Sequence, residues 1–274
     1  MMKSKITGGP TEMIFSCRVL NKYDVKYYRC LETGFVHTEE PYWLQEAYSS
    51  AITKLDIGML SRNELFREST IKLLSRHFDT DQTFLDYAGG YGVFTRLMRD
   101  KGFNFYHTDT YCQNIFAEYF DLADCPQKKG FGLVTAFEVF EHLVNPKEEI
   151  KQMLAFSDHL FFSTVLQPEE LKSKLTDWWY MIPETGQHVS LYTKEALAYL
   201  AKEMGLNFYT DGNNMHLFSK LVLDVNPFDF PVDKPPYLIK IMKRKVSRFE
   251  RKQKPEKETL LTKDFNKIKE KLKA

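Results

Sequence analysis

One short stretch constrains the fold more than any other: a glycine-rich turn at residues 88–92, between an apolar run and a helical pattern. The run 83–86 is predicted to be a strand, 93–101 a helix, and 103–108 a second strand that ends at Asp109. Glycines permit a tight turn and a close approach of the backbone to a ligand. The order strand, glycine turn, helix, strand, acid is typical of a nucleotide-binding βαβ unit.

Helix-like and strand-like patterns alternate across the middle of the chain. Further strands are predicted at 132–137, 159–165, 206–210 and 215–222, and further helices at 61–78, 146–156 and 193–204. The helix at 61–78 begins with Ser61-Arg-Asn-Glu64, the pattern of a capping box. Alternating units of this length predict an α/β fold with a parallel sheet and helices on both faces.

The sequence divides into three regions: residues 1–50, rich in short aromatic segments, the alternating domain 51–225, and a tail 226–274. From residue 234 the tail carries 15 Lys plus Arg and 5 Asp plus Glu, which leaves −9 on the rest of a chain with net charge +1. Apolar residues at helical spacing run through it: Leu238, Met242, Val246, Phe249, then Leu261, Phe265, Ile268 and Leu272. Such a basic amphipathic tail suits a membrane surface, a nucleic acid, or an acidic protein surface, including that of this chain.

The sequence carries no sign of export or of a membrane span. No segment approaches the roughly 18 apolar residues of a spanning helix, and the N-terminus lacks the apolar core of a signal peptide. Four cysteines in 274 residues do not make a disulfide framework. A cytoplasmic protein is expected, with a peripheral place at the inner face of a membrane as the variant that the tail suggests.

A second group of chemistry-bearing residues lies where the strand 132–137 ends, in the segment Glu138-Val-Phe-Glu141-His142. Ligands bind at the carboxyl ends of the strands of an open α/β sheet, so these titratable side chains are site candidates. A neutral histidine near pH 7 suits removal of a hydroxyl proton. Capping of the next helix is the structural alternative for Glu141 and His142.

Three motifs together resemble the class I S-adenosylmethionine (SAM)-dependent methyltransferases. The turn beginning at Asp86 is similar to their Asp-x-Gly-x-Gly-x-Gly motif, with Ala88 in place of the first glycine. Residues 138–146 resemble their Glu-Val-Leu-Glu-His-Leu-x-Asp-Pro segment, and 187–200 their His-aromatic-helix segment. The resemblance covers about residues 17–225 and implies a Rossmann-like, seven-stranded, mostly parallel sheet, here with a β-rich N-terminal segment and a basic helical tail.

The same resemblance implies the cofactor and the residues that bind it. SAM would be the methyl donor and S-adenosylhomocysteine the product, with Asp109 on the ribose and Asp121 near the adenine. The cofactor-binding residues implied are Asp86, Ala88, Gly89, Gly90, Gly92, Asp109, Thr110, Asp121 and Phe137. His142, Glu138 and His188 are the catalytic candidates. No metal is expected; the alternative is a divalent cation on Glu138, Glu141, His142 and His188, a set that resembles ubiquinone-pathway O-methyltransferases and small-RNA 2′-O-methyltransferases.

The N-terminal region suggests which molecule would accept the methyl group. Cys17 and Cys30 resemble half of a zinc ribbon found on bacterial methyltransferases that act on sugars and glycans, but Leu20 and Thr33 replace the other two ligands. Two thiolates do not complete a structural zinc site, so a degenerate ribbon without metal is expected. Residues 41–48 are predicted to form a lid over the cofactor pocket.

The resemblance implies methyl transfer to a small-molecule or sugar acceptor, at a hydroxyl. An RNA 2′-O-methyltransferase is one alternative, disfavoured because the acidic body is a poor partner for a nucleic acid. A non-catalytic scaffold that binds the cofactor is another. The aromatic run 178–180 follows the fifth predicted strand, where it either stacks on an acceptor ring or packs in the core.

Overall fold

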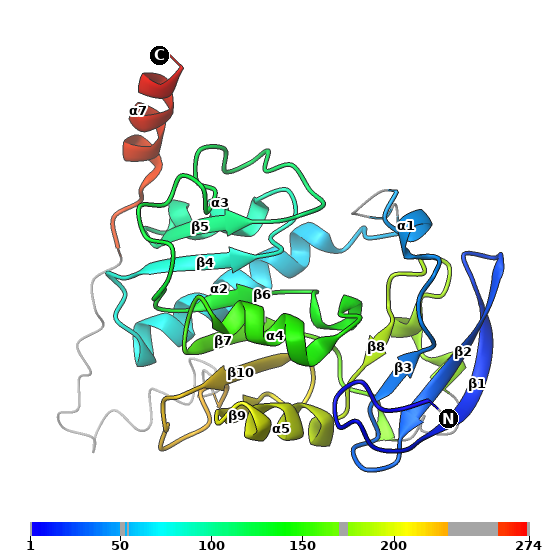
Figure 1. Ribbon diagram of the computed structural model, residues 1–274. Coiled ribbons are helices and arrows are strands. Elements are labelled where there is room, and N and C mark those ends of the chain that lie inside the picture. Colours follow the sequence, from blue (N-terminus) through cyan, green and yellow to red (C-terminus); the bar gives the residue numbers. More distant parts are fainter. Residues whose placement is uncertain (1, 50–52, 54, 170–174, 230–256, 273–274) are drawn as a thin grey trace, which may run out of the picture.

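The larger of two sheets forms the centre of the molecule. The computed structural model describes residues 2–49, 53, 55–169, 175–229 and 257–272. In these residues six strands are arranged in the order β5-β4-β6-β7-β10-β9 (Figure 1). Their bounds are β4 (Thr83–Tyr87), β5 (Asn104–Thr108), β6 (Val134–Ala136), β7 (His159–Ser163), β9 (Asn207–Thr210) and β10 (Met215–Ser219).

The sheet is mixed, and it has one strand fewer than expected. β5, β4, β6 and β7 pair in parallel, whereas β10 is antiparallel to both of its neighbours. The segment after β5 makes only a single parallel bridge, from His107 to Asp121. Side-chain hydrogen bonds of Asp109 and Asn114 to nearby backbone N–H groups turn this segment instead of extending it. The described chain therefore has a six-stranded sheet rather than the seven-stranded one predicted.

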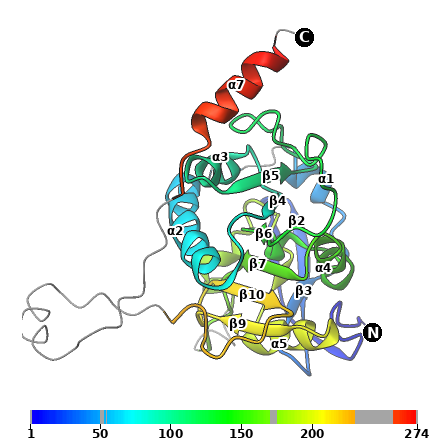
Figure 2. The ribbon, with the colours of Figure 1, turned by 90° about the vertical axis from the view of Figure 1, so that its left-hand side faces the viewer.

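Helices cover both faces of the sheet, as the alternating pattern predicts. α2 (Met59–His77) and α3 (Val93–Asp100) lie on one side, α4 (Pro146–Leu154) and α5 (Lys194–Glu203) on the other (Figure 2). Successive strand residues point to opposite faces. Phe84 therefore joins the core beside α2 and α3, while its neighbour Leu85 joins the core beside α4 and α5.

α2 begins earlier than predicted. Gly58 is its N-cap residue and Met59 its first residue, so Ser61 lies inside the helix and no capping box forms. Arg62, within the expected box, instead contacts two carboxylates outside the helix, those of Asp56 and Glu138. This tertiary contact places Arg62 beside the site described below.

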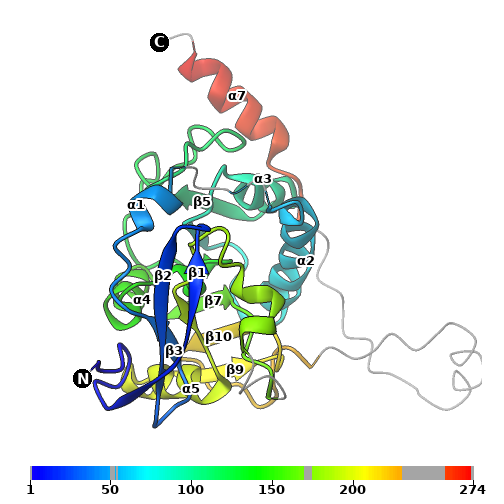
Figure 3. The ribbon, with the colours of Figure 1, turned by 90° about the vertical axis from the view of Figure 1, so that its right-hand side faces the viewer.

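The N-terminal region forms a second sheet that includes a strand from the domain. β1 (Thr11–Val19), β2 (Tyr23–Cys30), β3 (Val36–Thr38) and β8 (Ser190–Leu191) pair in this order (Figure 1). Figure 3 shows β1 and β2 at the front of the molecule. The short helix α1 (Leu44–Ala47) follows β3. Trp43 Nε1 donates to the carbonyl of Gly186 at 2.8 Å, and Gln187 Nε2 donates to that of Ala47 at 2.9 Å. Cys17 and Cys30 are both free thiols.

The C-terminal helix α7 (Leu261–Lys271) docks beside α3 through a charge contact (Figure 1). Asp264 is buried and accepts two hydrogen bonds from Arg99, at 2.7 and 2.8 Å. Ile268 packs on the core, but Leu261 and Phe265 of the same apolar stripe are exposed. The predicted stripe at 238–249 lies outside the described residues. In the part of the chain that is described, no helix is both long and apolar enough to cross a membrane.

Candidate active site

A cavity of about 720 Å³ lies where the parallel strands end, within the range of cofactor and small-molecule sites. Its wall combines the glycine turn after β4, the residues after β5 and β6, the start of α2, and residues of the N-terminal segment and of the loop 179–188. Leu44 and Tyr48 belong to this wall, so part of the predicted lid segment faces the cavity. The topology thus gathers chemistry-bearing side chains from distant parts of the sequence.

The carboxyl group of Asp86 lies directly against Gly89 of the glycine turn. This buried carboxyl group accepts hydrogen bonds from Thr95 Oγ1 at 3.0 Å and Thr135 Oγ1 at 3.1 Å, and burial raises its pKa to about 6. A Cβ added at Gly89 would lie 2.3 Å from Asp86 Oδ2, so only glycine fits between this carboxyl group and the cavity. Ala88 takes a positive φ of 54°, in the left-handed region that glycine prefers.

Asp109 joins the turn to the end of β5. Its Oδ2 accepts the N–H of Gly90 at 3.0 Å, and its Oδ1 accepts those of Tyr111 and Cys112 at 2.6 and 2.7 Å. Asp109 and Thr110 both line the cavity. The acid at the strand end therefore has two roles: it fixes the turn and presents oxygen atoms to the cavity.

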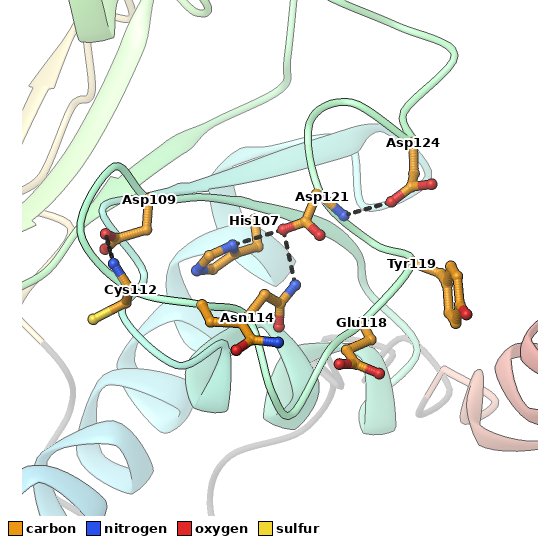
Figure 4. Close-up of a pocket in the computed structure, with 9 residues that line it drawn as sticks. His107, Asp109, Cys112, Asn114, Glu118, Tyr119, Asp121 and Asp124 are labelled. Carbon is orange, nitrogen blue, oxygen red and sulfur yellow. Dashed lines mark hydrogen bonds and ion pairs between the residues drawn. The ribbon is translucent and has the colours of Figure 1, made fainter.

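Two predicted cofactor residues do not line this cavity. Gly92 faces Asn114, whose Oδ1 would lie 2.2 Å from a Cβ added at Gly92. Asp121 lies in an adjacent open pocket of about 440 Å³ (Figure 4). There its Oδ1 contacts His107 Nδ1 at 3.0 Å, while His107 Nε2 donates to the carbonyl of Gly90 at 2.9 Å. Asp121 thus reaches the glycine turn through His107.

Phe137 lines the cavity but is also part of the core. Its ring stacks on Phe66 of α2 with centroids 4.3 Å apart, and it meets Phe94 and Phe161 edge-on. The following residue, Glu138, takes a positive φ of 55°, an uncommon conformation for a non-glycine residue and one that concentrates at functional sites. The backbone at the end of β6 is therefore bent sharply toward the cavity.

Glu138 is held by two partners. Ser163 Oγ donates to its Oε1 at 2.7 Å, and Arg62 Nε lies 3.1 Å from its Oε2. Arg62 also contacts Asp56 at 2.7 Å, so its guanidinium is shared between two carboxylates. Burial, with a smaller effect of the neighbouring Glu141, raises the pKa of Glu138 to about 7.

Glu141 differs from every other carboxyl group of the cavity. It lies in the short helix η1 (Phe140–His142), is fully buried, and neither of its carboxyl oxygens makes a well-formed hydrogen bond among the described residues, although the hydroxyl groups of Tyr180 and Thr164 are near enough to favour its charged form. Burial raises its pKa to about 7. A buried carboxyl group without a well-formed hydrogen bond is costly, so this one indicates a missing ligand or proton.

His142 and His188 meet across the cavity with ring centroids 5.0 Å apart. His142 Nδ1 donates to the carbonyl of Gln187 at 3.1 Å, and His188 Nδ1 donates to that of Tyr180 at 2.6 Å. Because carbonyl oxygens only accept, Nδ1 carries the proton in both rings and the Nε2 lone pairs remain available. Burial lowers the pKa of His142, and that of His188 to about 3, so both rings are neutral at pH 7.

The predicted four-residue metal set is brought together only in part. One ligand atom each from Glu141, His142 and His188 lies within 4.8 Å of the other two. Glu138 is instead engaged by Arg62. Histidine ligands of metals usually donate their second N–H to a carbonyl or carboxylate, as both rings do here. Two imidazoles and a carboxyl group without a well-formed hydrogen bond among the described residues fit a divalent cation.

Several cavity residues are absent from the sequence-based site. Arg62 is one of them: it lies in a segment with the pattern of a helix cap, so the sequence did not predict its contact with Glu138. Tyr48 stacks on Tyr111 with centroids 5.0 Å apart, and this pair joins the N-terminal segment to the loop after β5. The two tyrosines are 63 positions apart in the sequence, and no local motif marks them as partners.

The aromatic run 178–180 is divided between the core and the wall of the cavity, and stacking on an acceptor ring stays a prediction. Trp178 is buried in the core of the N-terminal sheet. Trp179, the first residue of η4 (Trp179–Met181), is 71% exposed and lines the cavity. Tyr180 is buried, lines the cavity and accepts the hydrogen bond from His188 with its carbonyl.

Comparison with known protein families identifies the family to which the chain belongs. Residues 60–210, more than half of the chain, match the family described as "Methyltransferase domain". The chain therefore belongs to the methyltransferase domain family, which confirms the resemblance to class I SAM-dependent methyltransferases. No curated protein matches the chain.

Solved structures with a similar fold are distant. The methyltransferase bound to the Trm112 activator of Haloferax volcanii is 15% identical, with a TM-score of 0.46, and the match covers 64% of this chain and 97% of that one. An O-methyltransferase family protein from Burkholderia thailandensis is 10% identical, with a TM-score of 0.39 and coverage of 57% and 59%. An O-methyltransferase family 2 protein from Planctomyces limnophilus, in complex with apigenin, is 11% identical, with a TM-score of 0.38 and coverage of 63% for both chains. The chain thus spans about three fifths of the two O-methyltransferases.

Proposed function

We propose that the protein is a SAM-dependent methyltransferase that methylates a hydroxyl group of a small molecule. One observation carries this proposal: the glycine turn with Asp109 and the neutral pair His142 and His188 line a single cavity at the strand ends. A donor site and a proton-accepting group are both needed for methyl transfer to a hydroxyl. The cavity brings the two together.

The charge of the cavity suits the proposed donor. Among the described residues, six carboxyl side chains line it, those of Asp56, Asp86, Asp109, Glu138, Glu141 and Glu149, against one guanidinium, that of Arg62. SAM carries a positive sulfonium and an ammonium group, and an acidic wall attracts such a cation. Asp109, at the end of β5, is the group placed to accept the ribose hydroxyls. The chemistry of these side chains therefore fits the cofactor.

When bound, SAM supplies a methyl group on a sulfonium, and S-adenosylhomocysteine leaves as a neutral thioether once the oxygen–carbon bond has formed. The chain's own contribution is alignment, exclusion of water and removal of the hydroxyl proton. His142 Nε2 accepts this proton, because its Nδ1 proton is committed to the carbonyl of Gln187. Glu138 lies near enough for its charge to favour the imidazolium so formed.

Assistance by a divalent cation is a second candidate, favoured by the cluster of Glu141, His142 and His188 and by the carboxyl group of Glu141, which makes no well-formed hydrogen bond within the described residues. A bound cation of this kind would lower the pKa of an acceptor hydroxyl. The two versions differ in what they require. Dialysis against EDTA would abolish turnover in the second and leave it unchanged in the first.

Calorimetric titration of SAM tests the proposal directly. We expect micromolar binding to the wild type and at least tenfold weaker binding to Asp109→Asn. Asp109→Ala also removes an acceptor from three backbone N–H groups, so the milder substitution is the better test. Asp158→Asn is the matched control, since Asp158 lies outside the cavity and pairs with Lys220. Absence of SAM binding to the wild type contradicts the proposal.

Three other functions follow from the sequence, and each has its own test. A sugar or glycan acceptor is suggested by the N-terminal resemblance and would be methylated in place of simpler alcohols. An RNA acceptor would require methylation of bulk RNA in vitro, which the acidic wall disfavours. A non-catalytic scaffold would bind SAM without turning it over. Contacts of the basic tail with a membrane or a protein remain a separate prediction, as does a cytoplasmic location.

A further inference from the structure

The mouth of the cavity differs in character from its interior. Four of its lining side chains are apolar and largely exposed: Leu55 at 59%, Ile57 at 94%, Tyr111 at 69% and Trp179 at 71%. They come from three separate segments, which lie before α2, after β5 and in η4. Exposed apolar groups that gather around one opening mark a binding surface, whereas a single exposed apolar residue does not.

Among the described residues, the interior beyond this mouth offers no free positive charge to an anionic acceptor. Arg62 is the one Lys or Arg among the described lining residues, and it is shared between Asp56 and Glu138. A phosphate or a nucleotide needs positive partners, which the described part of this wall does not provide. The reacting end of an acceptor would meet the neutral rings of His142 and His188.

We infer that the acceptor is an uncharged alcohol or phenol with a large apolar body, whose hydroxyl enters toward His142 while its apolar body lies on Leu55, Ile57, Tyr111 and Trp179. This inference rests on the proposed methyl transfer and specifies its substrate class. In the step, the acceptor oxygen forms a bond to the methyl carbon and the carbon–sulfur bond breaks. The pair of electrons stays on sulfur, and the hydroxyl proton moves to His142 Nε2.

A series of 4-alkylphenols, from 4-methylphenol to 4-octylphenol, tests this placement by calorimetry in the presence of S-adenosylhomocysteine. Burial of one methylene is worth up to about 0.8 kcal/mol, so we expect affinity to rise about two- to fourfold per added carbon. Ile57→Ser and Trp179→Ala should flatten this dependence without changing the affinity for SAM. Val222→Ser is the matched control, because Val222 is 80% exposed and lies outside the cavity.

The outcomes separate the inference from the proposed function. SAM binding together with an affinity that does not depend on chain length would overturn the inference and leave methyl transfer standing. Stronger binding of methyl glucoside than of 4-octylphenol would also overturn it, in favour of a sugar acceptor. Loss of the chain-length dependence in Ile57→Ser, but not in Val222→Ser, would support it. Alkylphenol binding without SAM binding would support the apolar site and refute the methyltransferase.

Discussion

The two ends of the cavity are built differently. At the glycine turn every carboxylate has donors: Asp86 binds two threonine hydroxyls, Asp109 three backbone N–H groups, and Asp121 both His107 and Asn114. At the other end, Glu138 has Ser163 and Arg62 as partners but sits on a strained backbone, and Glu141 makes no well-formed hydrogen bond within the described residues. The carboxyl groups at the glycine turn are therefore satisfied by the protein itself, whereas Glu141 at the other end would be stabilised by a ligand or a proton.

From this difference we expect SAM binding and methyl transfer to depend on different residues. A preformed turn binds a cofactor without reorganisation, since its groups are already oriented. Acid–base groups work best when their pKa lies near the working pH, and burial raises the pKa of Glu138 and of Glu141 to about 7. Burial lowers the pKa of His142, which keeps that ring neutral and able to accept a proton. Changes at the glycine turn should therefore affect SAM affinity, and changes around His142 should affect turnover.

The largest expected effect is that of His142→Ala on turnover. Loss of a general base costs about 10²- to 10⁴-fold, and we expect that range in kcat with an alkylphenol that the wild type methylates. SAM affinity, measured by calorimetry, should stay within twofold of the wild type. His77→Ala, on the far end of α2, is the control. A tenfold loss of SAM affinity in His142→Ala would contradict the expectation that SAM binding and turnover depend on different residues.

The next effect is on stability and concerns Glu141. An unfolded glutamate ionises near 4.5, whereas the buried carboxyl group ionises at about 7. Between these values the folded state holds a proton that the unfolded state loses, so the free energy of unfolding falls as the pH rises from 4.5 to 7. Glu141→Gln cannot ionise, and we expect it to be more stable than the wild type at pH 8 by about 1–3 kcal/mol and equal to it near pH 4.5.

Urea unfolding in EDTA at both pH values measures this difference. EDTA is needed because a bound divalent cation would stabilise the wild type and mask the effect. Glu148→Gln, an exposed position on α4, should behave like the wild type at both pH values. Equal stability of wild type and Glu141→Gln at pH 8 would mean that ionisation of the buried Glu141 does not destabilise the folded state.

A smaller effect is expected where Asp121 acts through His107. Loss of its charge in Asp121→Asn weakens the hydrogen bond that orients His107 toward the carbonyl of Gly90, and we expect SAM to bind about tenfold more weakly. His107→Phe should cause a similar loss, and the double variant no more than either alone. Additive losses would instead favour the predicted direct contact of Asp121 with the adenine.

The geometry around the glycine turn could be predicted from the sequence better than the geometry around Glu138, for a physical reason. The turn after β4 and Asp109 after β5 lie in one local βαβ unit, and parallel strands bring their carboxyl ends together whatever the rest of the chain does. Arg62 meets Glu138 only because α2 packs across the sheet with that side chain toward the cavity. No local pattern encodes this rotation, and the apparent capping box at Ser61 pointed to another role.

The expected strand count failed for a related reason. The family resemblance implies seven strands, but the segment after β5 has side chains that hydrogen-bond to their own backbone and turn it. Asp121 follows this turned segment into the neighbouring pocket (Figure 4), and its place near the adenine stays a prediction. Of the four residues of the alternative metal set, Glu138 lies apart from the other three because it pairs with Arg62. Each difference comes from a contact of this particular chain.

The smallest expected effect concerns pH and decides which group limits the reaction. Burial lowers the pKa of His142 below 6.5, so the base stays neutral and available as the pH falls to that value. An ordinary histidine would be half protonated there, which makes the expected difference in kcat/KM only about twofold. The profile of the wild type should therefore be flat from pH 8 to 6.5 and fall below it. A fall that begins near pH 7 would instead follow the ionisation of Glu138 or Glu141, both near 7, and would transfer the limiting role from the imidazole to a carboxylate.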